Sequence, residues 1–168
     1  MLDQLKEIWL RLHLKKSAEY TATSNIKDQV IIILPPQLYE WENEIKQNLL
    51  KLFPEIKSSR LVYFGLKQNL SIPEEQQITP KKMSWLGKIK NSEIEEKITQ
   101  PVKFFIVLTQ QPSFYHRWLL TKSNAEYRLT NHYDLLKYAD ICINAPYEKW
   151  EVFIQEMKKI VGSKSSNK

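Results

Sequence analysis

The stretch Val30–Leu34 reads Val-Ile-Ile-Ile-Leu and is followed at once by Pro35-Pro36. A continuous apolar run rich in β-branched residues is typical of a strand buried on both faces of a parallel sheet. Proline stops such a run because it lacks the N–H that a ladder needs. Two further runs of the same kind follow at Leu61–Gly65 and Val102–Leu108. Three buried strands along one chain predict a parallel sheet as the core of the fold.

The segments between these strands have the spacing of helices. Apolar residues repeat at helical intervals from Leu38 to Phe53, which predicts a helix packed on the sheet. Ser92 and Ser113 are the expected N-caps of two further helices. A last amphipathic helix is expected to end at Gly162.

Shorter strands are indicated at residues 126–130 and 141–143, whereas residues 66–91 have the composition of a long loop. Alternating strands and helices predict the α/β class. With right-handed crossovers, the chain is expected to form an open, mostly parallel five-stranded sheet with helices on both faces. The expected fold is Rossmann-like or flavodoxin-like, with the strand order 2-1-3-4-5.

A short basic amphipathic helix is predicted over residues 1–16, because Leu2, Leu5, Trp9 and other apolar residues share one helical face. The rest of the chain divides into a linker (17–28), a single α/β domain (29–162) and a basic disordered tail (163–168). Three interpretations of the apolar face stay open. It docks on its own domain, on a protein partner, or, through Leu2, Leu5 and Trp9, on an anionic membrane surface.

The net charge of +6 is unevenly distributed. Residues 1–27 carry five basic and three acidic side chains, whereas residues 81–90 and 158–168 each carry four lysines and no acid. Such clusters attract anionic partners within a Debye length of about 8–10 Å. The single cysteine, Cys142, cannot form an internal disulfide, and neither an export signal nor an apolar span of membrane length is found. A cytoplasmic protein is therefore expected.

The strand ends lack the patterns of common active sites. Pro-Pro-Gln-Leu follows the first strand where a dinucleotide site would need Gly-x-Gly-x-x-Gly. The sequence holds no Walker loop, no nucleophile elbow, no paired carboxylates at strand ends and no Cys/His cluster with zinc spacing. Cys142 lies in an apolar strand, where a thiol is inert. No catalytic residue, metal or cofactor is predicted, and the sequence favours a protein without enzymatic activity.

A lysine-rich loop lies between the apolar runs Leu61–Gly65 and Val102–Leu108 and is the first candidate binding site. It combines one tryptophan and one glycine with four lysines, namely Lys81, Lys82, Trp85, Gly87, Lys88 and Lys90. Aromatic stacking together with phosphate contacts suits RNA or another polyanion. A protein assembly is the other partner considered, and no motif for sequence-specific DNA recognition is found. In the competing interpretation, Trp85 and Leu86 pin the loop to the core and the lysines are solvated.

The second candidate site lies at the carboxyl ends of the strands, where open α/β sheets bind ligands. His116 and Arg117 are placed at the start of the helix after the third strand. Both are candidates for contact with an anion such as a substrate phosphate. This alternative makes the chain a small-molecule domain.

The loop and a later stretch resemble an uncharacterised family of short cytosolic proteins found in Bacteroidetes. That family typically has an Asn-Trp-Phe-Gly-Lys-Pro-Lys-like loop and then Ser-x-Ala-x-aromatic-x-Val-Gly. The matching positions are Trp85, Gly87, Lys88, Ser123, Ala125, Tyr127 and Leu129. The resemblance covers about residues 1–160 and implies a fold and a lineage without an established activity.

The chain departs from that family pattern at several positions. Leu86 replaces the usual Phe, Ile89 the usual Pro and Thr130 the usual Gly. Thr109 and Gln110 stand where an acidic residue is often found, which weakens a catalytic interpretation. A fainter similarity links the chain to the N-terminal half of two-lobed glycosyltransferases and implies a degenerate, sugar-nucleotide-related domain. The first hypothesis is therefore a non-catalytic binding or adaptor protein, and the second is the small-molecule domain.

Overall fold

The computed structural model describes residues 27–84 and 88–165 and contains one open sheet of six parallel strands. The strand order is β3-β2-β1-β4-β5-β6. The strands are β1 (Lys27–Leu34), β2 (Ser58–Phe64), β3 (Gln77–Ile78), β4 (Val102–Val107), β5 (Ala125–Thr130) and β6 (Ile141–Cys142). The predicted Rossmann-like α/β fold is confirmed, and the five expected strands lie in the expected order. The strand count of five was wrong, because β3 forms inside the predicted loop 66–91.

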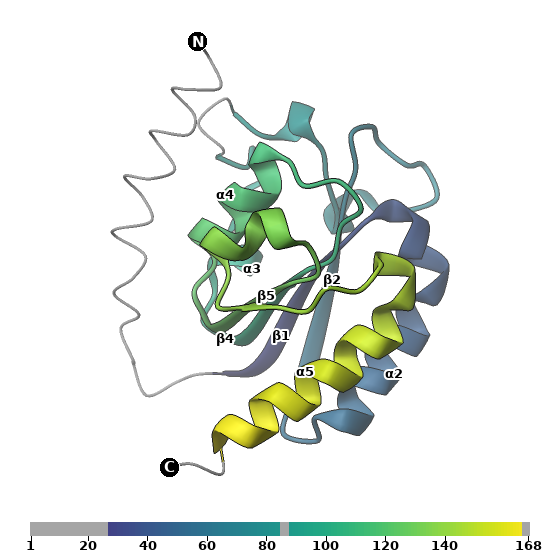
Figure 1. Ribbon diagram of the computed structural model, residues 1–168. Helices are drawn as coiled ribbons and strands as arrows, with labels where there is room; N and C mark the ends of the chain where they lie inside the picture. The colour runs from purple at the N-terminus through teal and green to yellow at the C-terminus, as the bar shows by residue number, and fades with distance from the viewer. Residues whose placement is uncertain (1–26, 85–87, 166–168) are drawn as a thin grey trace.

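Helices cover both faces of the sheet (Figure 1). On one face lie α2 (Glu42–Leu52) and α5 (Trp150–Ser165), which pack against each other. On the other face lie α3 (Ser92–Thr99) and α4 (Phe114–Lys122). Short 3-10 helices connect these elements: η1 (Pro36–Trp41), η2 (Glu74–Gln76), η3 (Pro80–Lys82), η4 (Tyr133–Tyr138) and η5 (Tyr147–Lys149).

The central position of β1 explains its apolar sequence. Val30, Ile32 and Leu34 point into the core under α2 and α5, whereas Ile31 and Ile33 point into the core under α3 and α4. All five side chains are at most 2% exposed. A strand with helices on both faces has no solvated side, so it needs a continuous apolar run.

The helix boundaries differ from the sequence prediction at two N-terminal positions. The chain forms η1 before α2 begins at Glu42, so the predicted single helix from Leu38 starts as a 3-10 helix. Asn91, and not Ser92, is the N-cap of α3, and its Oδ1 accepts from Glu93 N–H at 3.0 Å and Ile94 N–H at 3.3 Å. Ser113 is the N-cap of α4, as predicted.

The prediction that Gly162 ends the last helix was wrong. Helix α5 continues through Gly162 to Ser165 and so includes three residues of the predicted tail. A Cβ added at Gly162 would meet nothing within 4 Å. The helix continues because Val161 still packs on the core beneath it.

Replacing Gly162 by alanine is therefore expected to stabilise the protein by about 0.5–1 kcal/mol, because alanine loses less backbone entropy in a helix. Urea unfolding monitored by circular dichroism measures this difference. A helix that ended at Gly162 in a left-handed conformation would instead be destabilised by the same substitution.

Residues 1–26, 85–87 and 166–168 lie outside the described residues. The predicted amphipathic helix 1–16 with Leu2, Leu5 and Trp9 belongs to this part of the chain, as does most of the predicted linker 17–28. Strand β1 begins at Lys27, two residues before the expected start of the domain at Gln29.

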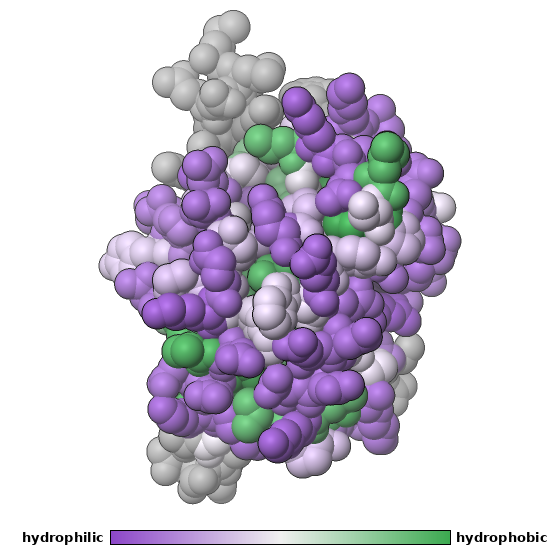
Figure 2. Space-filling view, turned by 90° about the vertical axis from the view of Figure 1, so that its right-hand side faces the viewer, coloured by the Kyte–Doolittle hydropathy of each residue, from purple (hydrophilic) through white to green (hydrophobic). Residues whose placement is uncertain are grey.

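The side of the molecule that carries α2 and α5 is mostly hydrophilic (Figure 2). Its exposed hydrophobic residues form small separate patches, and Leu50 and Val152 are among the exposed residues of these helices. Scattered apolar side chains of this kind are normal on a solvated surface. The hollows that could hold a ligand or a partner lie instead at the strand ends and at an edge of the sheet.

Candidate functional site

A cavity of about 290 Å³ opens at the carboxyl ends of β1, β2 and β4. From β1 the chain moves to β2 on one side, while β4 pairs with β1 on the other side. The loops after β1 and β4 therefore diverge, which leaves a crevice at the topological switch point of the sheet. The cavity is lined by Pro35, Pro36, Gln37, Phe64, Gly65, Leu66, Thr109, Gln110, Gln111, Pro112, Ser113, His116 and Tyr147.

Gly65 permits a close approach between the loops after β1 and β2. A Cβ at this position would lie 2.8 Å from Pro36 Cγ and 3.1 Å from the carbonyl oxygen of Lys67. Only a residue without a side chain fits there unless the proline ring or the loop moves. The glycine thus fixes how closely the two loops that line one wall of the cavity approach each other.

Asn131, at the end of β5, holds the loop after β4 in place. Its Oδ1 accepts from Thr109 N–H at 2.8 Å, and its Nδ2 donates to the carbonyl oxygens of Thr109 and Ala145, each at 3.0 Å. Thr109 Oγ1 in turn accepts from Gln111 N–H at 3.2 Å. The side chain of Asn131 is 5% exposed. This buried amide thereby joins the loops after β4, β5 and β6 and positions Thr109–Gln111 at the cavity.

His116 is the only histidine, and Tyr147 the only tyrosine, among the lining residues. The Nδ1 atom of His116 accepts from Ser113 N–H at 3.1 Å, which completes the capping box of α4. Its ring packs edge-on against Phe64, with the centroids 4.6 Å apart. Burial lowers the pKa of His116 to about 4, so the ring is neutral at pH 7. Nδ1 is an acceptor, so Nε2 carries the hydrogen, and the described residues offer Nε2 no hydrogen-bond partner.

The structure separates the two residues of the second candidate site. His116 lines the cavity and Arg117 does not. A neutral imidazole contributes a hydrogen-bond donor, and it supplies no positive charge to an anion. No lysine, arginine, aspartate or glutamate is among the lining residues. The polar groups that remain are glutamine amides, hydroxyls and the imidazole.

A second hollow of about 290 Å³ shares Gln37 and Tyr147 with the first. Trp41, which is 46% exposed, lines it together with Glu148 and Glu151. An exposed indole ring offers an apolar face for stacking. The two carboxylates make this neighbouring region negative, so it disfavours an anionic ligand.

The lysine-rich loop is the base of a hairpin. Met83 and Ile89 form an antiparallel bridge, and both side chains are buried in the core under α3 and α4. Ser84 N–H donates to Lys88 O at 2.7 Å, and Lys90 N–H donates to Lys82 O at 2.7 Å. Ile89, where the resembling family usually has proline, is thus an anchor of the loop.

The lysines of this loop are not equivalent. Lys82 pairs with Glu74 at 3.1 Å and its side chain is 19% exposed. Lys81, Lys88 and Lys90 are exposed, and no carboxylate in the described part of the chain pairs with them. Trp85 and Gly87, together with Leu86, lie outside the described residues. The structure therefore brings three free lysines to the base of the hairpin, with Trp85 at a position it does not describe.

The strand ends were expected from the sequence, but two residues at this end of the sheet were not. These are Asn131 and Tyr147. The residue preceding Asn131, Thr130, is the last of a strand, so a polar residue directly after a strand was the available signal for Asn131. Burial raises the pKa of the Cys142 thiol, which agrees with the inert role expected for it.

None of the described helices is long and apolar enough to cross a membrane. Within residues 27–84 and 88–165, no three His, Cys, Asp or Glu side chains gather as a group that could hold a metal ion.

The comparisons with known proteins give one match. None of the curated proteins matches the chain. No solved structure matches it either. A family model described as "Family of unknown function (DUF6913)" matches residues 6–162, which is nearly the whole chain and agrees with the resemblance to an uncharacterised family. The chain therefore belongs to this family of unknown function, DUF6913.

Proposed function

We propose that this protein binds a small, uncharged, polar molecule in the switch-point cavity and does so without catalysing a reaction. The observation that carries the proposal is a cavity at the usual ligand position of an open α/β sheet with no charged lining side chain. Its volume of about 290 Å³ suits a ligand of monosaccharide or nucleoside size.

The polar lining supports the choice of a neutral ligand. The amides of Gln110 and Gln111 offer both donors and acceptors, and His116 Nε2 offers one donor that no described residue uses. A phosphate would need a cation, because an anion that loses its hydration without a counter-charge is costly. The carboxylates of Glu148 and Glu151 beside Trp41 add to that cost.

The proposal is tested with pairs of neutral and phosphorylated compounds: glucose and glucose 6-phosphate, and adenosine and adenosine monophosphate. Thermal shift and calorimetry on the full chain are expected to detect binding of a neutral member and weaker binding of its phosphorylated partner. Replacing Gln110 and Gln111 by alanine is expected to weaken that binding about tenfold, through the loss of one or two hydrogen bonds.

The matched control replaces Gln47 and Gln155, which lie on the outer sides of α2 and α5, by alanine. This control is expected to bind as the wild type does. Tighter binding of a phosphorylated compound, or equal binding by the Gln110/Gln111 variant, contradicts the proposal.

The basic hairpin supports a second candidate function, the binding of RNA. Lys81, Lys88 and Lys90 are held near one another by the Met83–Ile89 bridge and are free of carboxylates in the described part of the chain. Trp85 lies between them in the sequence and could stack on a base. As a binding or adaptor protein with this hairpin, the chain would act in the cytoplasm, a location that its single cysteine also favours.

Replacing Lys81, Lys88 and Lys90 by glutamine is expected to weaken binding of a 20-nucleotide polyuridylate. The slope of log K against log salt is expected to fall by about 2, because up to three phosphate contacts are lost. Lys82 is left in place because it pairs with Glu74. A control variant with Lys51, Lys137 and Lys149 changed to glutamine has the same net charge and should keep the wild-type slope. Equal slopes in the two variants would show that the hairpin lysines do not contact the RNA.

A further inference from the structure

Among the residues that the structure describes, strand β2 has an open edge along much of its length. It pairs with β1 from Ser58 to Tyr63, but with β3 only at Tyr63 and Phe64. The short strand β3 therefore does not pair with the first part of β2 on that side. No other described strand pairs with Ser59–Val62 on this edge.

The hydrogen-bonding pattern between β2 and β3 shows which backbone N–H and C=O groups face the open edge. Gly65 N–H donates to Ile78 O at 3.1 Å, so Gly65 directs its N–H toward β3. Alternate residues of a strand direct their N–H and C=O groups to the same side. The N–H and C=O groups of Leu61 and Ser59 therefore also face this side, and no described residue hydrogen-bonds to them. These four groups can pair with one added strand.

The opposite edge of the sheet is protected where its terminal strand is equally short. Strand β6 pairs with β5 only at Leu129 and Thr130. Arg128 N–H, however, donates to the carboxylate of Asp140 at 2.7 Å, and Arg128 O accepts from Asp140 N–H at 2.8 Å. Proteins commonly block exposed edges by such devices. The edge of β2 has no equivalent among the described residues.

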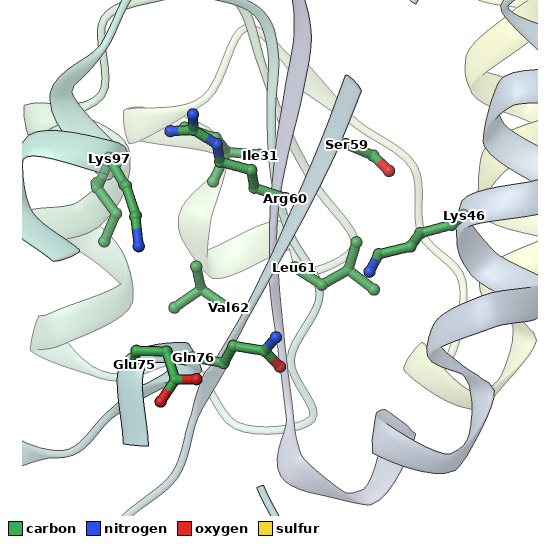
Figure 3. A pocket seen from close by; sticks show the side chains of 10 residues that line it. Ile31, Lys46, Ser59, Arg60, Leu61, Val62, Glu75, Gln76 and Lys97 are labelled. Carbon is green, nitrogen blue, oxygen red and sulfur yellow. The ribbon is translucent and has the colours of Figure 1, made fainter. Parts of the chain in front are cut away.

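A cavity of about 230 Å³ runs along the open edge of β2 (Figure 3). Lys46 reaches it from α2 on one side of the strand, and Lys97 reaches it from α3 on the other side. Arg60, on the same side as Lys97, donates to the side-chain oxygen of Gln100 at 3.0 Å. No carboxylate in the described part of the chain pairs with Arg60. Glu75, at the end near β3, is the only carboxylate among the lining residues.

The two lysines that line this cavity, Lys46 and Lys97, can exchange their present carboxylate partners for those of a ligand. Lys46 pairs with Glu42 and Lys97 pairs with Glu93, each one helical turn away. Both lysine side chains are 33% exposed. Ion pairs of this kind at the surface contribute about 0.3–0.5 kcal/mol, so a ligand carboxylate can compete for them at little cost.

We propose that the open edge of β2 binds an extended acidic segment of a partner protein as an added strand. The backbone of the segment pairs with Ser59 and Leu61. Its side chains alternate between the two faces, so acidic residues on one face meet Lys46 and those on the other meet Arg60 and Lys97. Main-chain pairing combined with side-chain selection is a known mode of peptide recognition.

Charge complementarity selects this occupant over a second copy of the chain. Two β2 edges paired about a two-fold axis would bring the Arg60, Lys46 and Lys97 groups of both copies together, and like charges across an interface are unfavourable. The site is separate from the switch-point cavity, and neither proposal depends on the other.

The probe is a fluorescent, end-capped octapeptide of four glutamates and four valines, with both residue types on each face of the extended chain. Fluorescence anisotropy with the full-length protein is expected to show saturable binding that weakens with salt. A peptide with glutamine for glutamate tests the charges. A peptide with N-methyl groups on alternate residues tests the backbone pairing. Each is expected to bind at least about tenfold more weakly.

Two protein variants separate the contributions. Ser59→Pro removes an N–H that faces the open edge, where proline is tolerated, and leaves the ladder to β1 intact. Ser59→Ala is its matched control. The triple variant with Lys46, Arg60 and Lys97 changed to glutamine removes the charges. Ser59→Pro and the triple variant are expected to lose binding about tenfold or more, and Ser59→Ala to retain it.

Amide hydrogen exchange gives a readout that electrostatic association alone would not change. In the free protein, the amides of Ser59 and Leu61 should exchange faster than those of Arg60 and Val62, which bond to β1. The peptide is expected to slow Ser59 and Leu61. Equal binding of the N-methylated peptide, or no slowing at these amides, overturns the proposal. So does a dimer in analytical ultracentrifugation that Ser59→Pro abolishes, which would assign the edge to a second copy.

Discussion

Lowering the pH from 6.5 to 4 is expected to remove about 3 kcal/mol of folding stability through His116 alone. Burial lowers the pKa of this side chain from 6.5 to about 4 in the folded protein. Between these values the unfolded chain binds the proton and the folded protein does not. Each step down in pH therefore stabilises the unfolded state, and the loss levels off once the pH falls below the folded pKa.

The His116→Gln variant isolates this effect. His116 is the third residue of α4, and a glutamine at that position can accept from Ser113 N–H as in a standard capping box. The variant should therefore fold at pH 7 while losing the titratable ring. Urea unfolding of both proteins at pH 7, 5.5 and 4.5 measures the difference, and carboxylates elsewhere contribute equally to the two curves. If both lose the same stability between pH 7 and 4.5, burial does not lower the pKa of His116 in the folded protein.

The strand order was predictable because three strands carry unbroken apolar runs and connections between parallel strands follow a general right-handed rule. Strand β3 was not predictable by the same means. Its first residue, Gln77, is polar yet 2% exposed. The side chain of Gln77 accepts from Asn69 N–H at 2.8 Å and donates to the carbonyl oxygens of Asn69 and Ile72. A buried glutamine that hydrogen-bonds to the backbone of a loop leaves no repeating apolar pattern by which a strand could be predicted.

The ends of the helices were also only partly predictable from the sequence. Asn91 and Ser92 are both good N-cap residues, so the sequence leaves a choice between neighbours that the reach of the Asn91 side chain decides. Gly162 is a common helix terminator, but the next turn of α5 forms anyway because the helix rests on the core through Val161. Boundaries of this kind depend on tertiary packing.

The place of the candidate site followed from the sequence, and its chemistry did not. The carboxyl ends of parallel strands meet at one end of a sheet, so Pro35, Gly65 and Gln110 were expected there together. Whether His116 would be a cation depended on its burial beside Phe64, which only the folded protein defines. Because it is buried, His116 is a neutral hydrogen-bond donor and not the cationic contact for an anion that the sequence suggested.

Asn131→Ala is expected to destabilise the protein by about 3 kcal/mol. The substitution leaves the N–H and C=O of Thr109 and the C=O of Ala145 without their partner in a buried region. Asn131→Asp is expected to cost a similar amount, because a carboxylate can accept from Thr109 N–H but cannot donate to the two carbonyl groups. Urea unfolding measures both. Asn144→Ala, an exposed position near Ala145, is the control and should change stability by less than about 0.5 kcal/mol.

Asn131→Ala also tests whether Asn131 holds the loop that lines the cavity. Without Asn131, the loop carrying Thr109 and Gln111 loses the contacts that join it to the ends of β5 and β6. Amide exchange at Thr109 and Gln111 should then accelerate more than exchange at Phe105 or Ile106 in the middle of β4. A uniform acceleration across β4 would show that Asn131 only adds to global stability. A local acceleration would identify it as the residue that holds one wall of the ligand site in place.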